Sequence, residues 1–288
     1  MTAHFQRASV LGAGTMGHGI AHTCAAAGLL VTLYDVDLGA VEAGFEHIKA
    51  NLDKGVSLEK ITPEDRDATL GRIELTSELA YALEHTPLVI EAAPESIELK
   101  LNLYRLVELR VGEDTVFATN TSSLSITRLA AGLEAPGRFI GMHFFNPAHI
   151  MKLVEVVTGD QTSDETTRLA VDFVRFIGRD PIVVQDSPGF ASSRLGIILG
   201  LEAIRMVEAG VASPKDIDKA MTLGYRHPMG PLKLTDLVGL DVRLNIAEYL
   251  HRALESEAFR PPDLLKCMVG EGKLGKKSGE GFYRWEES

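Results

Sequence analysis

A glycine-rich segment near the start of the chain limits the possible folds more than any other feature. Gly12-Ala13-Gly14-Thr15-Met16-Gly17 has the spacing GxGxxG. It follows an apolar run predicted as a strand over 9–11, and it opens a stretch rich in Ala and Ile that predicts a helix over 15–27. A second apolar run, Leu30 to Tyr34, is followed directly by Asp35. This succession of strand, glycine turn, helix and acid-terminated strand predicts the first βαβ unit of a doubly wound sheet.

The same loop is predicted to bind the phosphates of a dinucleotide. Gly12 permits the tight turn, Gly14 lets the backbone approach a pyrophosphate, and Gly17 allows the helix to pack closely on the sheet. The helix N-terminus offers N–H groups and the positive end of its dipole to the phosphates. Asp35 can accept hydrogen bonds from a ribose diol and repels a 2′-phosphate, so NAD is favoured over NADP. FAD uses the same loop, and such a turn can also bind nothing, so both alternatives stay open.

Short apolar runs recur at regular intervals through the first 186 residues and predict one mostly parallel sheet. The runs lie at 9–11, 30–34, 73–75, 88–92, 116–119, 139–142, 153–157 and 181–184. Between them, apolar residues at helical spacing predict helices over 15–27, 41–52, 97–110 and 164–177. Alternating strands and helices of this kind are typical of a Rossmann-type α/β domain, which we assign to residues 1–186.

The pattern changes at Asp186-Ser187-Pro188-Gly189, a cluster of turn-forming residues. After it no comparable strand-like run occurs, and helices are predicted over 190–209, from Pro214 onward, over 231–254 and over 263–269. We therefore predict a smaller all-α domain over 187–288. A domain of about a hundred residues has limited stability alone, so we expect it to form a homodimer and to close over the substrate.

Charge and cysteine content exclude several classes of function. The chain of 288 residues has a formal net charge of -11 and lacks a long run of Lys or Arg, which argues against nucleic acid as a partner. Its two cysteines, Cys24 and Cys267, suggest neither a zinc site nor a disulfide framework, and no metal is expected. No apolar run reaches the roughly 18 residues of a membrane span, and the N-terminus lacks signal-peptide features, so we expect a cytoplasmic protein.

A histidine follows the predicted strand over 139–142 and is the best candidate for chemistry. The segment His143-Phe144-Phe145-Asn146-Pro147 begins there, and Glu155 lies twelve residues after the histidine. The carboxyl ends of parallel strands face the ligand crevice, where an imidazole can take a hydroxyl proton as hydride leaves the same carbon. Glu155 can hold the ring and stabilise the imidazolium. The alternative is a buried structural histidine and an exposed glutamate.

The segment Thr119-Asn120-Thr121-Ser122-Ser123 also follows a predicted strand. Its hydroxyl and amide groups are predicted to lie at the same edge of the sheet, where they can line a substrate pocket. The alternative is an N-cap loop for a helix near Ile126.

In its motifs and in their order, the sequence resembles the short-chain L-3-hydroxyacyl-CoA dehydrogenases, particularly the bacterial 3-hydroxybutyryl-CoA dehydrogenases. The resemblance runs from the glycine loop nearly to the C-terminus. Besides the glycine loop and the His143 segment, its matching segments are Asn120-Thr121-Ser122-Ser123-Leu124, Lys152-Leu153-Val154-Glu155-Val156, Ser187-Pro188-Gly189-Phe190 and Gly275-Lys276-Lys277-Ser278-Gly279-Glu280-Gly281-Phe282-Tyr283.

The resemblance implies hydride transfer between NAD and C3 of a 3-hydroxyacyl-CoA, giving a 3-oxoacyl-CoA, as in fatty acid β-oxidation. It implies that His143 is the base paired with Glu155 and that Ser122 binds the substrate near its reacting oxygen. Beyond the loop residues Gly12, Ala13, Gly14, Thr15, Met16 and Gly17, it implies cofactor contacts from Asp35, Glu95, Lys100, Ser122, Asn146 and Lys277. Lys100 and Ser122 are also expected near the CoA thioester arm.

One position departs from the family pattern. The family usually carries Asn just before the Arg that follows Pro-Gly-Phe, whereas here Ser193 precedes Arg194. A serine hydroxyl reaches less far than an amide, and loss of such a donor can cost about a hundredfold in rate. We still expect Ser193 to contact the substrate, and we expect Lys54 to contact the CoA arm. The alternatives are a dehydrogenase of a 3-hydroxy acid without CoA, or a dinucleotide-binding protein with little turnover.

Overall fold

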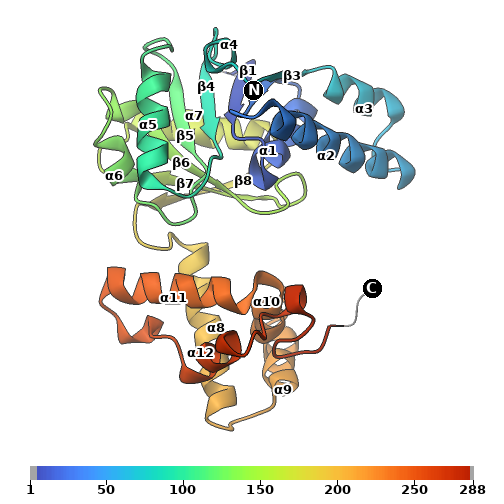
Figure 1. Ribbon diagram of the computed structural model, residues 1–288, viewed down its shortest axis with the longest axis vertical. Coiled ribbons are helices and arrows are strands. Elements are labelled where there is room, and N and C mark those ends of the chain that lie inside the picture. The colour runs from blue at the N-terminus through green and yellow to red at the C-terminus, as the bar shows by residue number, and fades with distance from the viewer. Residues whose placement is uncertain (1–4, 286–288) are drawn as a thin grey trace. The chain divides into compact units, whose positions relative to one another are not determined.

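The computed structural model of the protein describes residues 5–285. Contacts divide the chain into two units, Met1–Ser187 and Pro188–Ser288, whose helices and strands are labelled in Figure 1. The division falls within the turn-forming cluster 186–189, where the sequence pattern changes. Closure and dimerisation, the roles expected of the second domain, stay predictions.

The first unit is built on one sheet of eight strands, in the order β3-β2-β1-β4-β5-β6-β7-β8. Strands β1 to β6 pair in parallel, β7 runs antiparallel to β6, and β8 runs parallel to β7. The prediction of a mostly parallel, Rossmann-type sheet is confirmed. The strands are β1 (Arg7–Leu11), β2 (Leu30–Tyr34), β3 (Ile73–Thr76), β4 (Leu88–Glu91), β5 (Val116–Thr119), β6 (Phe139–Phe144), β7 (Leu153–Thr158) and β8 (Asp180–Gln185).

Central strands are buried along their whole length. Every residue of β4, β5 and β6 is buried, whereas β8 at the edge of the sheet has mostly exposed or half-buried residues. Parallel strands covered by helices on both faces read as continuous apolar runs, and this explains why they could be recognised from sequence. The helices of this unit are α1 (Thr15–Ala26), α2 (Leu38–Ser57), α3 (Pro63–Leu70), α4 (Leu79–Ala82), α5 (Ile97–Glu108), α6 (Ile126–Ala130) and α7 (Asp164–Phe176), with a 3₁₀ turn at Pro136–Arg138.

The second unit is helical around its own apolar core, which includes Ile197, Leu201, Leu232, Leu240 and Leu250. The helical stretch predicted over 231–254 is two helices, because Gly239 between them has φ 104°, a value that a continuous α-helix cannot contain. The elements are α8 (Ser192–Glu208), α9 (Pro214–Lys219), α10 (Pro231–Val238), α11 (Leu240–Leu254) and α12 (Asp263–Gly270), with short turns at Ala220–Gly224, Glu257–Phe259 and Lys276–Ser278.

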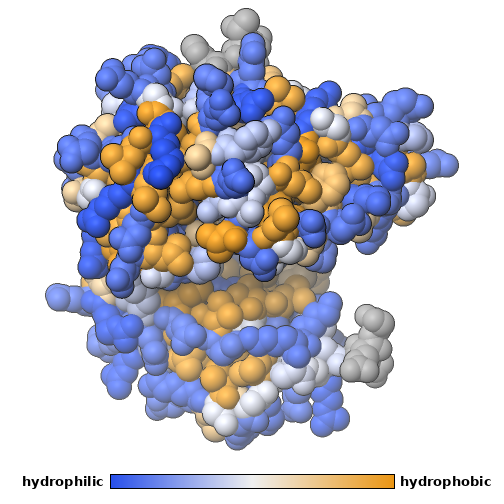
Figure 2. Space-filling model, turned by 45° about the horizontal axis from the view of Figure 1, so that its top comes forward, coloured by the Kyte–Doolittle hydropathy of each residue, from blue (hydrophilic) through white to orange (hydrophobic). Residues whose placement is uncertain are grey.

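Hydrophilic residues cover most of the surface seen in Figure 2, and hydrophobic residues reach the surface between them. In the second unit Leu195, Leu223 and Tyr225 are among the exposed large apolar side chains. Within residues 5–285, no helix has the length and apolar character needed to cross a bilayer.

His22 of α1 is expected to make the fold sensitive to acid. Its ring is buried and stacks on His149, with centroids 5.0 Å apart, and burial lowers the pKa of His22 to about 4, helped by His149 and Arg179. The unfolded chain, with a pKa near 6.5, therefore binds this proton first as the pH falls. We expect His22 to remove up to about 3 kcal/mol of unfolding free energy between about pH 6.5 and pH 4.

Urea unfolding of the wild type and of His22→Gln across this pH range measures the effect. The variant should lose less stability on acidification than the wild type. His85→Gln is the matched control, because the His85 side chain is 90% exposed. Equal pH slopes for wild type and His22→Gln would refute the assignment.

Candidate active site

The glycine loop connects β1 to α1, and two of its glycines are required by contacts within the protein. Gly12 has φ 105°, and a Cβ on it would lie 2.7 Å from the carbonyl oxygen of Ala92. A Cβ on Gly17 would lie 1.7 Å from the carbonyl oxygen of Gly12. Gly14 differs, because nothing lies within 4 Å of its added Cβ. Space beside Gly14 is what close approach of a ligand to the backbone requires.

The start of α1 is suited to bind phosphate. Its N-cap is Gly14, which provides no side-chain cap, so the first N–H groups of the helix keep no partner from a capping side chain. At the end of β2, Oδ2 of Asp35 accepts a hydrogen bond from the Ala13 N–H at 2.9 Å. The carboxylate thus lies against the loop, where a ribose next to a bound pyrophosphate would be expected. Residues present here fit a dinucleotide.

His143 and Glu155 form a hydrogen-bonded pair. Strands β6 and β7 are antiparallel, and their register places His143 directly opposite Glu155. Nδ1 of the imidazole lies 2.8 Å from Oε2 of Glu155, whose side chain is 0% exposed. The alternative of an exposed glutamate is therefore wrong. A carboxylate that accepts from Nδ1–H leaves Nε2 as the proton acceptor of the ring.

A cavity of about 360 Å³ lies at the carboxyl ends of the central strands. Met16 from the start of α1 contributes to its wall together with His143 and Ser122. Met16 of the helix that follows the glycine loop and the imidazole of His143 thus line one cavity. The full lining comprises Met16, Ala92, Ala93, Glu95, Asn120, Ser122, His143, Phe144, Phe145 and Asn146.

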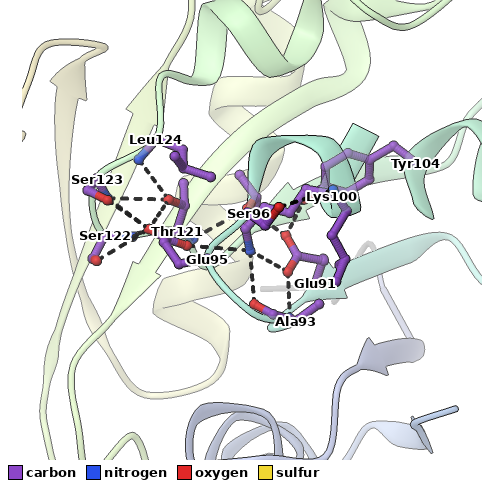
Figure 3. A network of polar contacts seen from close by, with 12 residues as sticks. Glu91, Ala93, Glu95, Ser96, Lys100, Tyr104, Thr121, Ser122, Ser123 and Leu124 are labelled. Carbon is purple, nitrogen blue, oxygen red and sulfur yellow. Dashed lines mark hydrogen bonds and ion pairs between the residues drawn. The ribbon is translucent and has the colours of Figure 1, made fainter. Parts of the chain in front are cut away.

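Glu95, which lines this cavity, holds the loop after β5 by hydrogen bonds (Figure 3). Oε1 of Glu95 accepts from the Thr121 hydroxyl at 2.6 Å and from the N–H groups of Ser122 and Ser123 at 3.1 and 3.2 Å. The helix α6 is capped by Ser125, which accepts from the Arg128 N–H, so the cap lies outside the segment 119–123. Ser122 instead lines the cavity.

Comparison with known proteins agrees with this geometry. The family model for the 3-hydroxyacyl-CoA dehydrogenase NAD binding domain matches residues 7–187, and the model for the C-terminal domain of the same family matches residues 189–285. The chain belongs to the 3-hydroxyacyl-CoA dehydrogenase family. The resemblance inferred from sequence is confirmed.

Relatives of this dehydrogenase match it over almost its whole length. A probable 3-hydroxybutyryl-CoA dehydrogenase of Bacillus subtilis (strain 168) is 44% identical over 96% of each chain. A 3-hydroxybutyryl-CoA dehydrogenase of Bradyrhizobium diazoefficiens is 41% identical, covering 98% of this chain and 96% of the relative. The crystal structure of (S)-3-hydroxybutyryl-CoA dehydrogenase from Ralstonia eutropha has a TM-score of 0.94 at 41% identity, over 98% of this chain and 100% of that one.

The enzyme is thus an NAD-dependent 3-hydroxyacyl-CoA dehydrogenase, and the prediction of NAD is confirmed. FAD and an empty structural turn, the two alternatives for the glycine loop, are excluded. Within residues 5–285, no group of three or more His, Cys, Asp or Glu side chains is arranged to hold a metal ion.

Lys100, a predicted cofactor contact, is buried among oxygen atoms of the protein. Its side chain is only 1% exposed, and its ammonium lies 2.5 Å from Glu91 Oε1, 3.1 Å from the Ala93 carbonyl oxygen and 3.6 Å from Glu95 Oε2. An ammonium has three N–H donors, and three oxygens already surround this one. Direct contact of Lys100 with the cofactor or the thioester arm stays a prediction.

Glu91 was not predicted as a site residue, whereas Asn120 belongs to the segment 119–123 that was predicted to line the pocket. Glu91, at the end of β4, is fully buried and accepts from Lys100. Asn120 accepts at Oδ1 from the Phe144 N–H at 2.8 Å and so joins the loop after β5 to the strand that carries His143. A carboxylate that ends an otherwise apolar strand was the available signal for Glu91.

Three further predicted contacts, Lys54, Ser193 and Lys277, lie in other elements of the chain. Lys54 of α2 lines a second cavity of about 930 Å³, between α1, α2, α3 and the loop 147–150. Ser193 lies in the first turn of α8. Lys277 is ion-paired with Asp241 at 2.6 Å within the second unit. Roles of Ser193 and Lys277 toward a ligand stay predictions.

Proposed function

We propose that this enzyme interconverts 3-hydroxybutyryl-CoA, or a similar short 3-hydroxyacyl-CoA, and its 3-oxoacyl-CoA, with His143 as the base. One observation carries this proposal: His143, held by the fully buried Glu155 at 2.8 Å, lines the same cavity as Met16 in the first turn of α1. The names of the relatives from Bacillus subtilis, Bradyrhizobium diazoefficiens and Ralstonia eutropha support the choice of acyl group.

In the oxidative direction, Nε2 of His143 takes the proton of the C3 hydroxyl while the hydrogen on C3 leaves with its electron pair. The C–O bond becomes a carbonyl, and the ring becomes an imidazolium that faces the Glu155 carboxylate. Because Glu155 is buried, little solvent screens this attraction. In reduction, the imidazolium returns the proton to the oxygen. Ser122, on the wall of the cavity, donates its hydroxyl hydrogen bond to the same oxygen.

The first N–H groups of α1 and the loop Gly12–Gly17 would hold the pyrophosphate of the dinucleotide, and Asp35 the adenosine ribose. Glu95, Ser122 and Asn146, which line the cavity, would lie near the nicotinamide end. When bound, NAD supplies the acceptor for the electron pair and hydrogen that leave C3.

Asp35→Asn should relax the discrimination against NADP. An asparagine keeps an oxygen that can accept from the Ala13 N–H, but it no longer repels a 2′-phosphate. We expect the ratio of kcat/KM for NADPH to that for NADH to rise about tenfold, equivalent to about 1.4 kcal/mol. Initial rates with each cofactor measure the ratio. Asp114→Asn, which removes the same charge from an exposed turn, should leave it unchanged.

The CoA arm is proposed to use the second cavity. Lys54, Lys60 and Arg72 line it and offer three cations to the phosphates of CoA. Ser193 is proposed to donate to the substrate oxygen with a shorter reach than the family's amide, and Ser193→Asn tests what this departure costs.

We further propose that the enzyme is a cytoplasmic homodimer that binds neither nucleic acid nor membrane and serves fatty acid β-oxidation. The net charge of -11 supports the absence of nucleic acid. Exposed apolar side chains such as Leu223 and Tyr225 on the second unit support association of two copies.

Absorbance of NADH, followed with acetoacetyl-CoA and separately with free acetoacetate, tests the proposed function. Oxidation of NADH with the thioester alone is the expected result. Equal rates with the free acid would favour a dehydrogenase that does not need CoA. No oxidation with either compound would leave a dinucleotide-binding protein with little turnover.

A further inference from the structure

A fully buried carboxylate ends strand β4. Glu91 is 0% exposed, and a carboxylate has about four positions at which it can accept hydrogen bonds. Four donors occupy them: Lys100 Nζ and the Ala93 N–H, each at 2.5 Å, the Thr119 hydroxyl at 2.8 Å, and the Tyr104 hydroxyl. Figure 3 shows Glu91 beside Ala93, Lys100 and Tyr104. Its hydrogen-bonding capacity is therefore filled by the protein itself.

Lys100 links this buried carboxylate to a second one. Its ammonium lies 2.5 Å from Oε1 of Glu91 and 3.6 Å from Oε2 of Glu95. Glu91 and Lys100 are both almost inaccessible, whereas the Glu95 side chain is 38% exposed and lines the cavity. One buried cation thus holds a carboxylate that faces the ligand space.

The other oxygen of Glu95 carries the loop after β5. Oε1 accepts from the Thr121 hydroxyl, from the N–H groups of Ser122 and Ser123, and from the Ser123 hydroxyl at 3.0 Å. With one oxygen beside Lys100 and the other bonded to the loop, the carboxylate has a fixed orientation. Movement of Lys100 would therefore move Ser122.

We propose that Glu91, Lys100 and Tyr104, named here the Glu91 cluster, position Glu95 and through it the hydroxyl and N–H of Ser122 against the cavity that His143 lines. The proposal rests on the proposed function, which gives Ser122 its contact with the substrate oxygen. A buried ion pair contributes little net stability, because apolar residues of similar volume are often as stabilising. A loop that must be placed to within a fraction of an ångström gains from such a pair, because its geometry is fixed.

The charges that face Glu95 indicate how the cluster can be detected. Burial acts to raise the pKa of Glu95, but the Thr121 hydroxyl, the Lys100 ammonium and the donors of Ser123 and Ser122 together hold it below its ordinary value. Glu91 from β4 is the other charged group of this network. Loss of the Lys100 ammonium should raise the pKa of Glu95, so ionised Glu95 would be lost at a higher pH.

The test replaces both buried charges at once. Glu91→Gln with Lys100→Met leaves no uncompensated charge in the core, whereas Lys100→Met alone would. In the reduction of acetoacetyl-CoA by NADH, kcat of the double variant should fall about tenfold to a hundredfold. The acid limb of its pH profile, the range in which kcat falls as the pH is lowered, should move to higher pH. Tyr104→Phe should show a smaller loss, and Tyr81→Phe, on the exposed Tyr81 of α4, none.

A double-mutant cycle with Glu95→Gln distinguishes a positioning role of the Glu91 cluster from a merely structural one. If the Glu91 cluster acts through Glu95, the double substitution should have little further effect on kcat once Glu95 is glutamine. Independent, multiplicative losses in the two backgrounds, or an acid limb that does not move, would overturn the proposal. If the double variant fails to fold, Tyr104→Phe carries the same cycle, because it keeps both charges and the ring contact with Phe139.

Amide hydrogen exchange of the peptide containing Ser122 and Ser123 reads the positioning without turnover. Exchange should be faster in the double variant than in the wild type, because these N–H groups donate to Glu95. If the wild type is inactive with acetoacetyl-CoA but exchange is faster in the variant, the proposed function is contradicted and the positioning of the loop by the Glu91 cluster is supported. If the wild type is active but exchange is unchanged in the variant, only the proposed positioning by the Glu91 cluster is contradicted.

Discussion

His143→Gln should lower kcat by about a thousandfold in both directions of the reaction, within the range that a positioned general base supplies. Glutamine is polar and of similar size, but it cannot take the hydroxyl proton as C3 is oxidised or return it in reduction. Binding of NADH should persist, because the glycine loop and Asp35 are unchanged. Initial rates with acetoacetyl-CoA and NADH give kcat, and the fluorescence of bound NADH gives the affinity.

His85→Gln is the matched control for this substitution, because His85 is highly exposed and lies outside the cavity. It should retain wild-type kcat. Turnover of His143→Gln within a few-fold of the wild type would show that another group moves the proton.

Gly17→Ala should weaken NADH binding at least about a hundredfold, which corresponds to about 2.7 kcal/mol. The added Cβ would lie 1.7 Å from the Gly12 carbonyl oxygen, a backbone atom that cannot move aside alone. The start of α1 must then shift away from β1, and its N–H groups leave the position at which they meet the pyrophosphate. NADH fluorescence titration measures the loss.

Gly112→Ala provides the comparison, since nothing lies within 4 Å of a Cβ at Gly112 and its φ is not positive. Circular dichroism of both variants checks that the fold is kept. NADH affinity of Gly17→Ala equal to that of Gly112→Ala would mean that the loop does not need the close packing of α1 on β1.

The sheet could be predicted well because its strands are continuous apolar runs between amphipathic helices. The direction of β7 was not predicted. Only residues 145–152 separate β6 from β7, and eight residues are too few for the crossover that a parallel pair needs, so the short connection was a usable signal. Helix α3 was missed because it is polar, although Thr62 and Asp65 form a capping box that its sequence indicates.

At the site, the His143–Glu155 pair could be predicted because each residue carries a recognisable role in a matching motif. The structure adds the register that makes them neighbours. Lys100 could not be placed from sequence, since whether a lysine on a helix points to solvent or inward depends on a tertiary partner, here Glu91. Lysine is almost never fully buried unless it is paired, and nothing in the sequence indicated that Glu91 would be its partner.

A crystal structure with NAD and acetoacetyl-CoA both bound tests the central claim most directly. We expect Nε2 of His143 to lie within about 3.2 Å of the oxygen on C3, with the nicotinamide against the same carbon. An imidazole far from that oxygen, or a thioester bound away from the cavity that His143 lines, would contradict this claim.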